Sequence, residues 1–152
     1  MDRVIRHARA LFSGLILLLF ISAPFASAEE ASEYTDDHIN LYYFHGTSRC
    51  ANCYKIEQYT EEAVEKFFEK ELASGRLVYK TIDVDKKENA HFVRDYQLYT
   101  KSVVLSVMKD GRETAYKDLE KIWGYIGDRE RFLNYIKEET SAFLDRLDSR
   151  AY

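Results

Sequence analysis

The sequence predicts one α/β domain, built as a three-layer α/β/α sandwich around a mixed central sheet. Two observations support this fold class. Runs of β-forming residues alternate with segments of helical spacing, which gives the element order β-α-β-α-β-β-α. Asp110-Gly111 then marks a tight hairpin turn between the last two strands. Strands separated by helices favour a parallel pair, and the hairpin adds antiparallel strands, so the sheet is expected to be mixed.

The first 28 residues have the pattern of a secretory signal. Three arginines fall within the first nine residues, an apolar run covers 11–21, and Ala26-Ser27-Ala28 supplies the small residues that signal peptidase accepts. The apolar run is shorter than the about 20 residues that a membrane span needs. We therefore expect residues 1–28 to be a signal peptide, with retention as a membrane anchor as the alternative. The protein is expected to be exported, to the periplasm or to the extracytoplasmic face of the membrane.

The rest of the chain suits a single domain with one core. Residues 29–37 are polar and acidic and predict a flexible leader, and residues 38–148 form the predicted domain. The whole chain has a formal net charge of −4. Loss of the signal, with its three arginines and one aspartate, leaves an even more acidic body. Binding to a phosphate backbone requires a basic face, so no nucleic-acid partner is expected.

The first half of the domain is predicted as strand, helix, strand. Residues 39–45 are rich in β-formers and predict a buried strand, which Gly46 ends. One long helix is expected to begin near Cys50 and to end at Gly75, and residues 77–84 predict the second strand. Apolar residues recur at helical spacing in the long helix, at Ile56, Tyr59, Ala63, Val64, Phe67, Phe68 and Leu72.

The second half is predicted as a short helix over 87–96, strands over 103–108 and 113–117, and a last helix capped by Asp128. The side chains expected to face inward are Ala90, Val93 and Tyr96 in the short helix, and Phe132, Ile136, Phe143 and Leu147 in the last helix.

The two cysteines of the chain lie together in Cys50-Ala51-Asn52-Cys53, where a strand gives way to a helix. A bridge over so short a loop would stabilise the fold little, so a structural staple is the weaker explanation. Free N–H groups and the dipole at a helix start stabilise a thiolate, which is the form that attacks disulfides. Arg49 adds a positive neighbour. Cys53 lies one turn further in, so we expect Cys50 to be the nucleophile and Cys53 its resolving partner.

Two further side chains near the motif are candidates for supporting roles. His45 could shuttle protons for Cys53, or could complete a Cu(I) or zinc site with Cys50 and Cys53. The alternative is a histidine whose ring lies in solvent or bonds to backbone. Glu57 could take a proton from Cys53, and the alternative is a solvated helix glutamate. The redox interpretation expects no metal.

At these residues the sequence resembles the thioredoxin superfamily. The likeness covers about residues 39–147 and includes the Cys-x-x-Cys motif, the strand end at 81–85 and the hairpin at 109–111. More narrowly, residues 43–53 and 55–57 resemble a family of exported thioredoxin-like proteins, the ArsF-type nitrophenyl-compound nitroreductase subunit. The resemblance implies a thioredoxin-like fold and a redox-active disulfide.

The chain departs from the superfamily pattern at four places. Arg49 stands where thioredoxins carry tryptophan, and Ala51-Asn52 replaces their Gly-Pro. Phe44 stands where the superfamily has a buried acid. The cis-proline that holds substrate beside the sulfurs has no counterpart, because Ser102 or Val103 falls at its position. Loss of that proline strengthens the metal alternative, since the proline is thought to discourage metal binding.

The sequence thus predicts an exported thiol–disulfide oxidoreductase that passes electrons through Cys50 and Cys53. Its partners would be a protein disulfide or dithiol client and, as a further hypothesis, a membrane electron donor. No Gly-rich dinucleotide loop is present, so no cofactor is expected. Two alternatives stay open, which are a soft-metal binding or chaperone protein using Cys50, Cys53 and His45, and a non-catalytic subunit of a redox complex.

Overall fold

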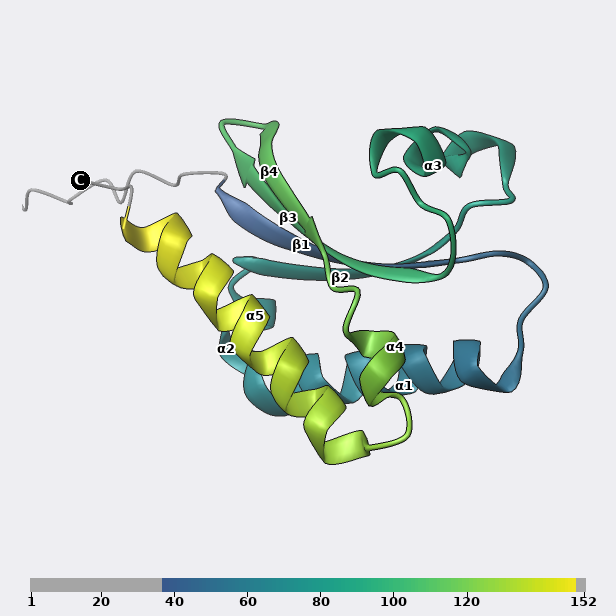
Figure 1. Ribbon diagram of the computed structural model, residues 1–152. Helices are drawn as coiled ribbons and strands as arrows, with labels where there is room; N and C mark the ends of the chain where they lie inside the picture. The colour runs from purple at the N-terminus through teal and green to yellow at the C-terminus, as the bar shows by residue number, and fades with distance from the viewer. Residues whose placement is uncertain (1–36, 150–152) are drawn as a thin grey trace, which may run out of the picture. The chain divides into compact units, whose positions relative to one another are not determined.

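The computed structural model describes residues 37–149. The predicted signal peptide and residues 29–36 of the predicted leader lie outside the described residues. Helices lie on both sides of a four-stranded sheet (Figure 1). In chain order the elements are β1 (His38–His45), α1 (Ala51–Phe67), α2 (Glu69–Ala73), β2 (Leu77–Asp83), the 3-10 helix η1 (Lys87–Asn89), α3 (His91–Asp95), β3 (Ser102–Lys109), β4 (Arg112–Asp118), α4 (Ile122–Tyr125) and α5 (Arg129–Ser149).

The sheet is mixed and has the strand order β2-β1-β3-β4. β1 pairs parallel with β2, whereas β1 with β3 and β3 with β4 pair antiparallel. Asp110 and Gly111 both have positive φ, 50° and 70°, as a tight hairpin turn requires, and aspartate and glycine tolerate that conformation best. The predicted parallel pair, hairpin and α/β fold class are therefore confirmed.

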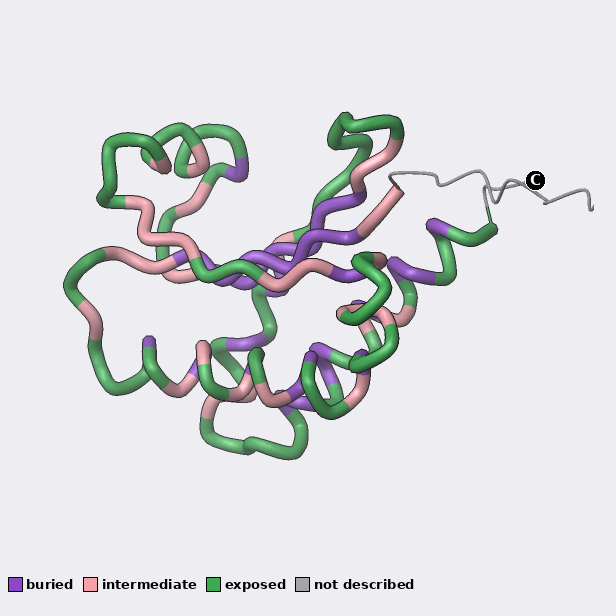
Figure 2. The backbone as a smooth tube through the Cα atoms, turned by 180° about the vertical axis from the view of Figure 1, so that it is seen from behind, coloured by how far each residue is buried: buried purple, intermediate pink, exposed green. Residues whose placement is uncertain are grey.

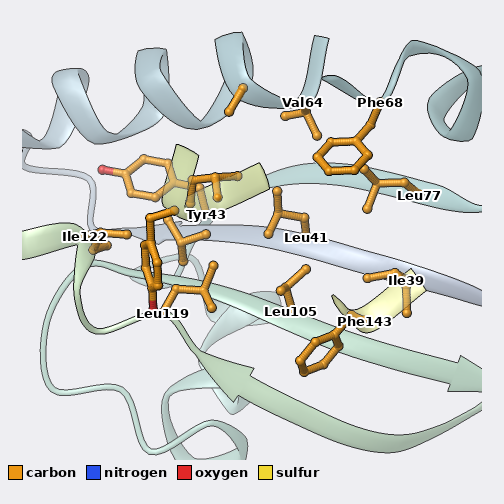
Figure 3. Close-up of a cluster of buried hydrophobic side chains, with 14 of the residues drawn as sticks. Ile39, Leu41, Tyr43, Val64, Phe68, Leu77, Leu105, Leu119, Ile122 and Phe143 are labelled. Carbon is orange, nitrogen blue, oxygen red and sulfur yellow. The ribbon is translucent and has the colours of Figure 1, made fainter. Parts of the chain in front are cut away.

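The main core lies between one face of the sheet and helices α1 and α5 (Figures 1 and 3). Alternation along β1 turns Ile39, Leu41 and Tyr43 toward these helices, and all three side chains are fully buried. Figure 2 shows that burial concentrates on the central strands and on one side of each long helix. The amphipathic helices thus bury their apolar stripes against a sheet that positions the end of β1 beside the start of α1.

A second, smaller cluster lies on the other face of the sheet, where α3 forms the third layer (Figure 1). The residues of β1 that alternate with the main-core set, Tyr42 and Phe44, pack there against Tyr96 and Val104. The rings of Phe92 and Tyr96 stack at 5.9 Å between centroids. The third layer is therefore thin and is held mainly by aromatic contacts.

Two helix predictions were wrong in detail. The long helix does not run unbroken to Gly75, because Phe68 leaves helical geometry (φ −133°, ψ 30°) and its ring is buried in the main core, so α1 and α2 are separate. The predicted helix over 87–96 is divided into η1 and α3. The tighter 3-10 turn changes the phase of the residues that follow, so Ala90 and Val93 are exposed while Phe92 packs inward beside Tyr96.

The last helix agrees with its prediction. The Asp128 carboxylate accepts the Arg131 N–H at 3.1 Å, as an N-cap does. The four predicted stripe residues of α5 are all buried, namely Phe132, Ile136, Phe143 and Leu147.

Asp37 marks the place where the described chain enters the domain. Its carboxylate accepts the backbone N–H of Asp110 at 3.1 Å and lies 3.6 Å from the Lys109 ammonium. The last residue of the predicted leader is thus fixed to the β3–β4 hairpin. None of the helices within residues 37–149 is long and apolar enough to cross a bilayer.

Candidate functional site

The two cysteines lie at the start of α1, immediately beyond the end of β1. Cys50 is the N-cap residue, with extended backbone (φ −99°, ψ 171°), and its side chain is exposed. Cys53, in the first turn, is fully buried. Both are free thiols, and their sulfurs lie 2.7 Å apart. An accessible sulfur is therefore in direct contact with a sheltered one.

Hydrogen-bond donors around the sulfurs favour a thiolate at Cys50. The pKa of Cys50 is lowered, first because the Cys53 thiol donates to its sulfur, and then because the backbone N–H groups of Cys53 and Asn52 point at it. The backbone N–H of Cys50 in turn donates to the Cys53 sulfur at 3.1 Å. These N–H groups belong to the start of α1, where a helix leaves N–H groups available to an acceptor such as sulfur, although the Cys53 N–H also donates to the Cys50 carbonyl at 3.0 Å.

Tyr43, on β1, supports the motif through a hydrogen bond to the first turn of α1. It extends from β1 toward α1 (Figure 3), is fully buried, and its hydroxyl donates to the carbonyl of Cys53 at 2.7 Å. Burial, followed by the nearby Cys53, raises the pKa of Tyr43 far above its usual value, so the phenol stays a donor. Sequence inspection did not assign Tyr43 a role. Alternation along the strand was the available signal, since Tyr43 and not Phe44 shares a face with Leu41.

Arg49 does not direct its charge at the thiolate. Its guanidinium forms an ion pair with Glu57, lies over the Tyr54 ring at 4.5 Å, and approaches the Tyr43 ring at 5.8 Å. The largest causes of the lowered Cys50 pKa are hydrogen bonds from Cys53 and backbone N–H groups, not Arg49. Arg49 and Glu57 therefore form a clasp between the β1–α1 loop and the second turn of α1.

His45 lies at the end of β1 and turns back toward its own loop. Its Nδ1 is 2.9 Å from the Gly46 carbonyl, and its ring lies 5.6 Å from the Tyr43 ring. This is the backbone-bonded alternative of the sequence analysis. Within residues 37–149 no three His, Cys, Asp or Glu side chains are arranged to hold a metal ion, so the structure does not bring His45 together with Cys50 and Cys53 as a metal site.

Ser102 and Val103 occupy the start of β3, on opposite faces of the sheet. Val103 is fully buried in the main core and pairs across the strands with Tyr43. The Ser102 hydroxyl donates to Asp118 at 3.0 Å, and burial raises the pKa of that carboxyl. All peptide bonds of the described chain are trans. Asp118 falls one residue beyond the strand predicted over 113–117, and the sequence analysis gave it no role.

The sheet order, the connectivity and a Cys-x-x-Cys motif at the start of the helix that follows the first strand define a thioredoxin-like fold. No family model matches the chain, and no curated protein matches it.

Among solved structures, similar chains include thioredoxin of Fasciola hepatica, with 18% identity over 60% of this chain and 81% of that chain and a TM-score of 0.37. Thioredoxin O2 of Arabidopsis thaliana in the oxidized state has 14% identity over 63% and 76%, with a TM-score of 0.37. The germline-specific thioredoxin Deadhead of Drosophila melanogaster has 22% identity over 60% and 81%, with a TM-score of 0.36. These likenesses are slight, so the fold class rests on the connectivity itself.

Proposed function

We propose that this protein is an exported thiol–disulfide oxidoreductase that works through Cys50 and Cys53. One observation supports this above all others: an exposed sulfur with a lowered pKa touches a fully buried sulfur at 2.7 Å. A nucleophile must be accessible and ionised, and its resolving partner must be close and protected from other disulfides.

The reduction of a client proceeds in two exchanges. The Cys50 thiolate attacks one sulfur of the client disulfide, so the client S–S bond breaks, a mixed disulfide forms, and the leaving client thiolate takes up a proton. Cys53 then loses its proton and attacks the Cys50 sulfur, which releases the second client thiol and leaves a Cys50–Cys53 disulfide. The client gains two electrons and the protein loses two. A dithiol donor, which we place in a membrane protein, restores the reduced form.

The neighbouring side chains hold this geometry in place. Tyr43 fixes the carbonyl of Cys53 and with it the first turn of α1. The clasp of Arg49 and Glu57 ties the loop that carries Cys50 to the same helix. Glu57 also stands four residues after Cys53, one turn along the same helix face. It is therefore the carboxylate nearest to Cys53 along the helix, and to receive the proton of Cys53 it would have to do so while paired with Arg49.

The narrower role within this function follows the sequence resemblance. Likeness to the ArsF-type exported subunits over residues 43–53 and 55–57 supports a protein that delivers electrons to a client in a larger redox assembly. Export is tested by producing the full chain in a bacterial host, fractionating the cells and determining the amino terminus of the product. We expect a periplasmic protein that begins at Glu29. A full-length cytoplasmic product would contradict export.

An insulin-disulfide reduction assay tests the redox function. We expect turnover by the wild-type protein and none by Cys50→Ser or Cys53→Ser. The Cys53→Ser variant should accumulate a mixed disulfide with the client, visible on a non-reducing gel. Wild-type protein that fails to reduce insulin, or a Cys50→Ser variant that retains turnover, would refute the proposal.

A further inference from the structure

Resting on this proposed function, we propose that Asp83 and Asp85 are positioning residues for thiol–disulfide exchange, because they hold the loop that carries Cys50 against the end of β2. The loop, residues 46–49, joins the last residue of β1 to the N-cap of α1. Within residues 37–149 neither carboxylate forms a hydrogen bond with a sulfur atom, so both act on Cys50 through the loop.

The loop depends on side chains for its position. Residues 46–49 belong to no helix or strand, and no backbone–backbone hydrogen bond of the described chain involves them. At its start the His45 ring contacts the Gly46 carbonyl. At its end Arg49 pairs with Glu57. A segment with so few main-chain bonds moves unless other contacts fix it, so the middle of the loop needs an anchor.

Thr47 supplies that anchor. Its backbone N–H donates to the Asp85 carboxylate at 2.8 Å, and its hydroxyl donates to the Asp83 carboxylate at 2.8 Å. The second Asp83 oxygen accepts the backbone N–H of Asp85 at 3.1 Å, which fixes the two carboxylates relative to each other. Hydrogen bonds to a charged acceptor are about twice as strong as neutral ones. These three residues, here called the Thr47 anchor, hold one loop residue by its main chain and by its side chain.

The sheet places both carboxylates next to the loop. β1 and β2 are parallel, so their carboxyl ends meet at the same edge, and Asp83 pairs in register with His45. The Asn89 amide donates to the Asp83 carbonyl at 2.9 Å, so this carboxylate extends from a backbone that is itself held. Gly46 permits the close approach of the loop, since a Cβ atom there would lie 2.8 Å from an Asp85 oxygen. A larger residue at position 46 would therefore displace Asp85.

The Asp83 carboxylate is held in its charged form. Partial desolvation acts to raise the pKa of Asp83, but the Thr47 hydroxyl and the Asp85 N–H lower it. The nearby His45 and Lys86 act in the same direction, and the net pKa is below the ordinary aspartate value. Hydrogen bonds to the charged form of an acid lower its pKa in this way. The Thr47 hydroxyl therefore has a charged acceptor at neutral pH.

The position of Cys50 determines how acidic its thiol is. Its sulfur receives the hydrogen bonds of the first turn of α1 only while Cys50 keeps the N-cap position. Thr47 stands three residues before Cys50, and such a segment spans at most about 10 Å. Release of Thr47 lets this segment move, takes the sulfur away from its donors, and raises the Cys50 pKa towards its ordinary value.

The charge of the two carboxylates acts in the opposite direction. A negative charge near a thiol disfavours the thiolate and raises the thiol pKa. Removal of a carboxylate therefore lowers the Cys50 pKa if Cys50 responds to the charge, and raises the Cys50 pKa if the hydrogen bond holds the loop. The sign of the change distinguishes positioning from simple electrostatics.

The test measures the rate of Cys50 alkylation by iodoacetamide against pH in the reduced protein, and mass spectrometry of the digest confirms the modified residue. Asp85→Ala removes both the charge and the acceptor, whereas Asp85→Asn removes the charge but keeps an acceptor for the Thr47 N–H. We expect Asp85→Ala to raise the Cys50 pKa, with alkylation at least about threefold slower at a pH below that pKa. Asp85→Asn should leave the Cys50 pKa at or below the wild-type value.

Three further variants examine the other contacts of the Thr47 anchor. Thr47→Val removes the hydroxyl bond to Asp83 and should raise the Cys50 pKa. Thr47→Ser retains the hydroxyl and should keep the wild-type Cys50 pKa. Gly46→Ala keeps both carboxylates but displaces Asp85, so it should raise the Cys50 pKa with every charge in place.

The matched control is Glu88→Ala, which removes an exposed carboxylate three residues after Asp85 and outside the Thr47 anchor. It should not raise the Cys50 pKa. Thr47 and Asp85 are both exposed, so their variants should keep the fold, and urea unfolding of each variant checks this.

The outcomes separate this inference from the proposed function. The positioning role would be overturned by a Cys50 pKa that falls or stays unchanged in Asp85→Ala, or that rises as much in Asp85→Asn. A Cys50 pKa that stays unchanged in both Thr47→Val and Gly46→Ala would overturn it as well. In each case insulin turnover by the wild type would leave the oxidoreductase function standing. A wild-type Cys50 with an ordinary pKa and no insulin turnover would overturn both.

Discussion

Removal of one hydroxyl group, in Tyr43→Phe, tests whether β1 positions the resolving cysteine. The buried hydroxyl donates to the Cys53 carbonyl at 2.7 Å. That carbonyl can still accept a helical N–H from the next turn, so the variant does not leave it without a partner. The expected loss is therefore that of one ordinary hydrogen bond, about 1 kcal/mol, and not the about 3 kcal/mol that an orphaned buried group can cost.

Urea unfolding of the reduced protein measures this loss. Small domains lose about 1–3 kcal/mol of stability per molar urea, so the midpoint should fall by about 0.3–1 M without a change in slope. Tyr99→Phe is the matched control, because the Tyr99 side chain is 94% exposed, and its midpoint should not move. An unchanged midpoint for Tyr43→Phe, or a fall as large as a core truncation causes, would refute the assignment of Tyr43.

Three further predictions follow from the site and the core. Cys53→Ala removes the hydrogen bond from the Cys53 thiol, which is the largest cause of the lowered Cys50 pKa, so the Cys50 pKa should rise. Cys53→Ser retains a hydrogen-bond donor and should preserve more of the lowering. The pH dependence of Cys50 alkylation measures the Cys50 pKa in both variants. Burial raises the pKa of Asp118, so the folded state holds that proton more tightly than the unfolded state. The Asp118 contribution to stability is then fully present below the ordinary aspartate pKa and is lost as the pH rises through the raised pKa of the folded state. In unfolding experiments across that pH range, Asp118→Asn should flatten this dependence. Leu105→Ala, in the centre of β3 (Figure 3), should cost about 2–5 kcal/mol in urea unfolding, because the side chain is fully buried.

Each of these predictions has an outcome that contradicts it. An alkylation pKa that stays unchanged in Cys53→Ala would show that Cys53 does not stabilise the thiolate. A stability profile for Asp118→Asn that parallels the wild type would show that the carboxyl titrates normally. A loss below about 1 kcal/mol for Leu105→Ala would mean that the site collapses around the truncation.

Much of the fold could be predicted from the sequence, because local signals and packing agree there. Asp110-Gly111 had the two residues that a tight hairpin requires, and Asp128 capped the last helix as expected. The break at Phe68 could not be foreseen, because the helical spacing of apolar residues continues through it. The break exists because the Phe68 ring is buried in the main core, which is a tertiary effect that overrides the local pattern.

The site was predicted in its two sulfurs and their order of burial, but not in its surroundings. Sequence proximity suggested that Arg49 would face the thiolate, whereas the structure pairs it with Glu57, eight residues further on. Tyr43 supports Cys53 from a different element, and only the packing of α1 on the sheet reveals it. Residues that are brought together by tertiary structure leave little trace in a single sequence.

The contacts of Asp37 fix one end of β1 far from the motif. Asp37 is held at the hairpin end of the sheet, while Cys50 follows the opposite end of β1 (Figure 1). Seven steps along a strand separate the two ends by about 23 Å. The dithiol thus lies at the pole of the domain farthest from the residue where the described chain begins, so a contact made at one end leaves the other accessible.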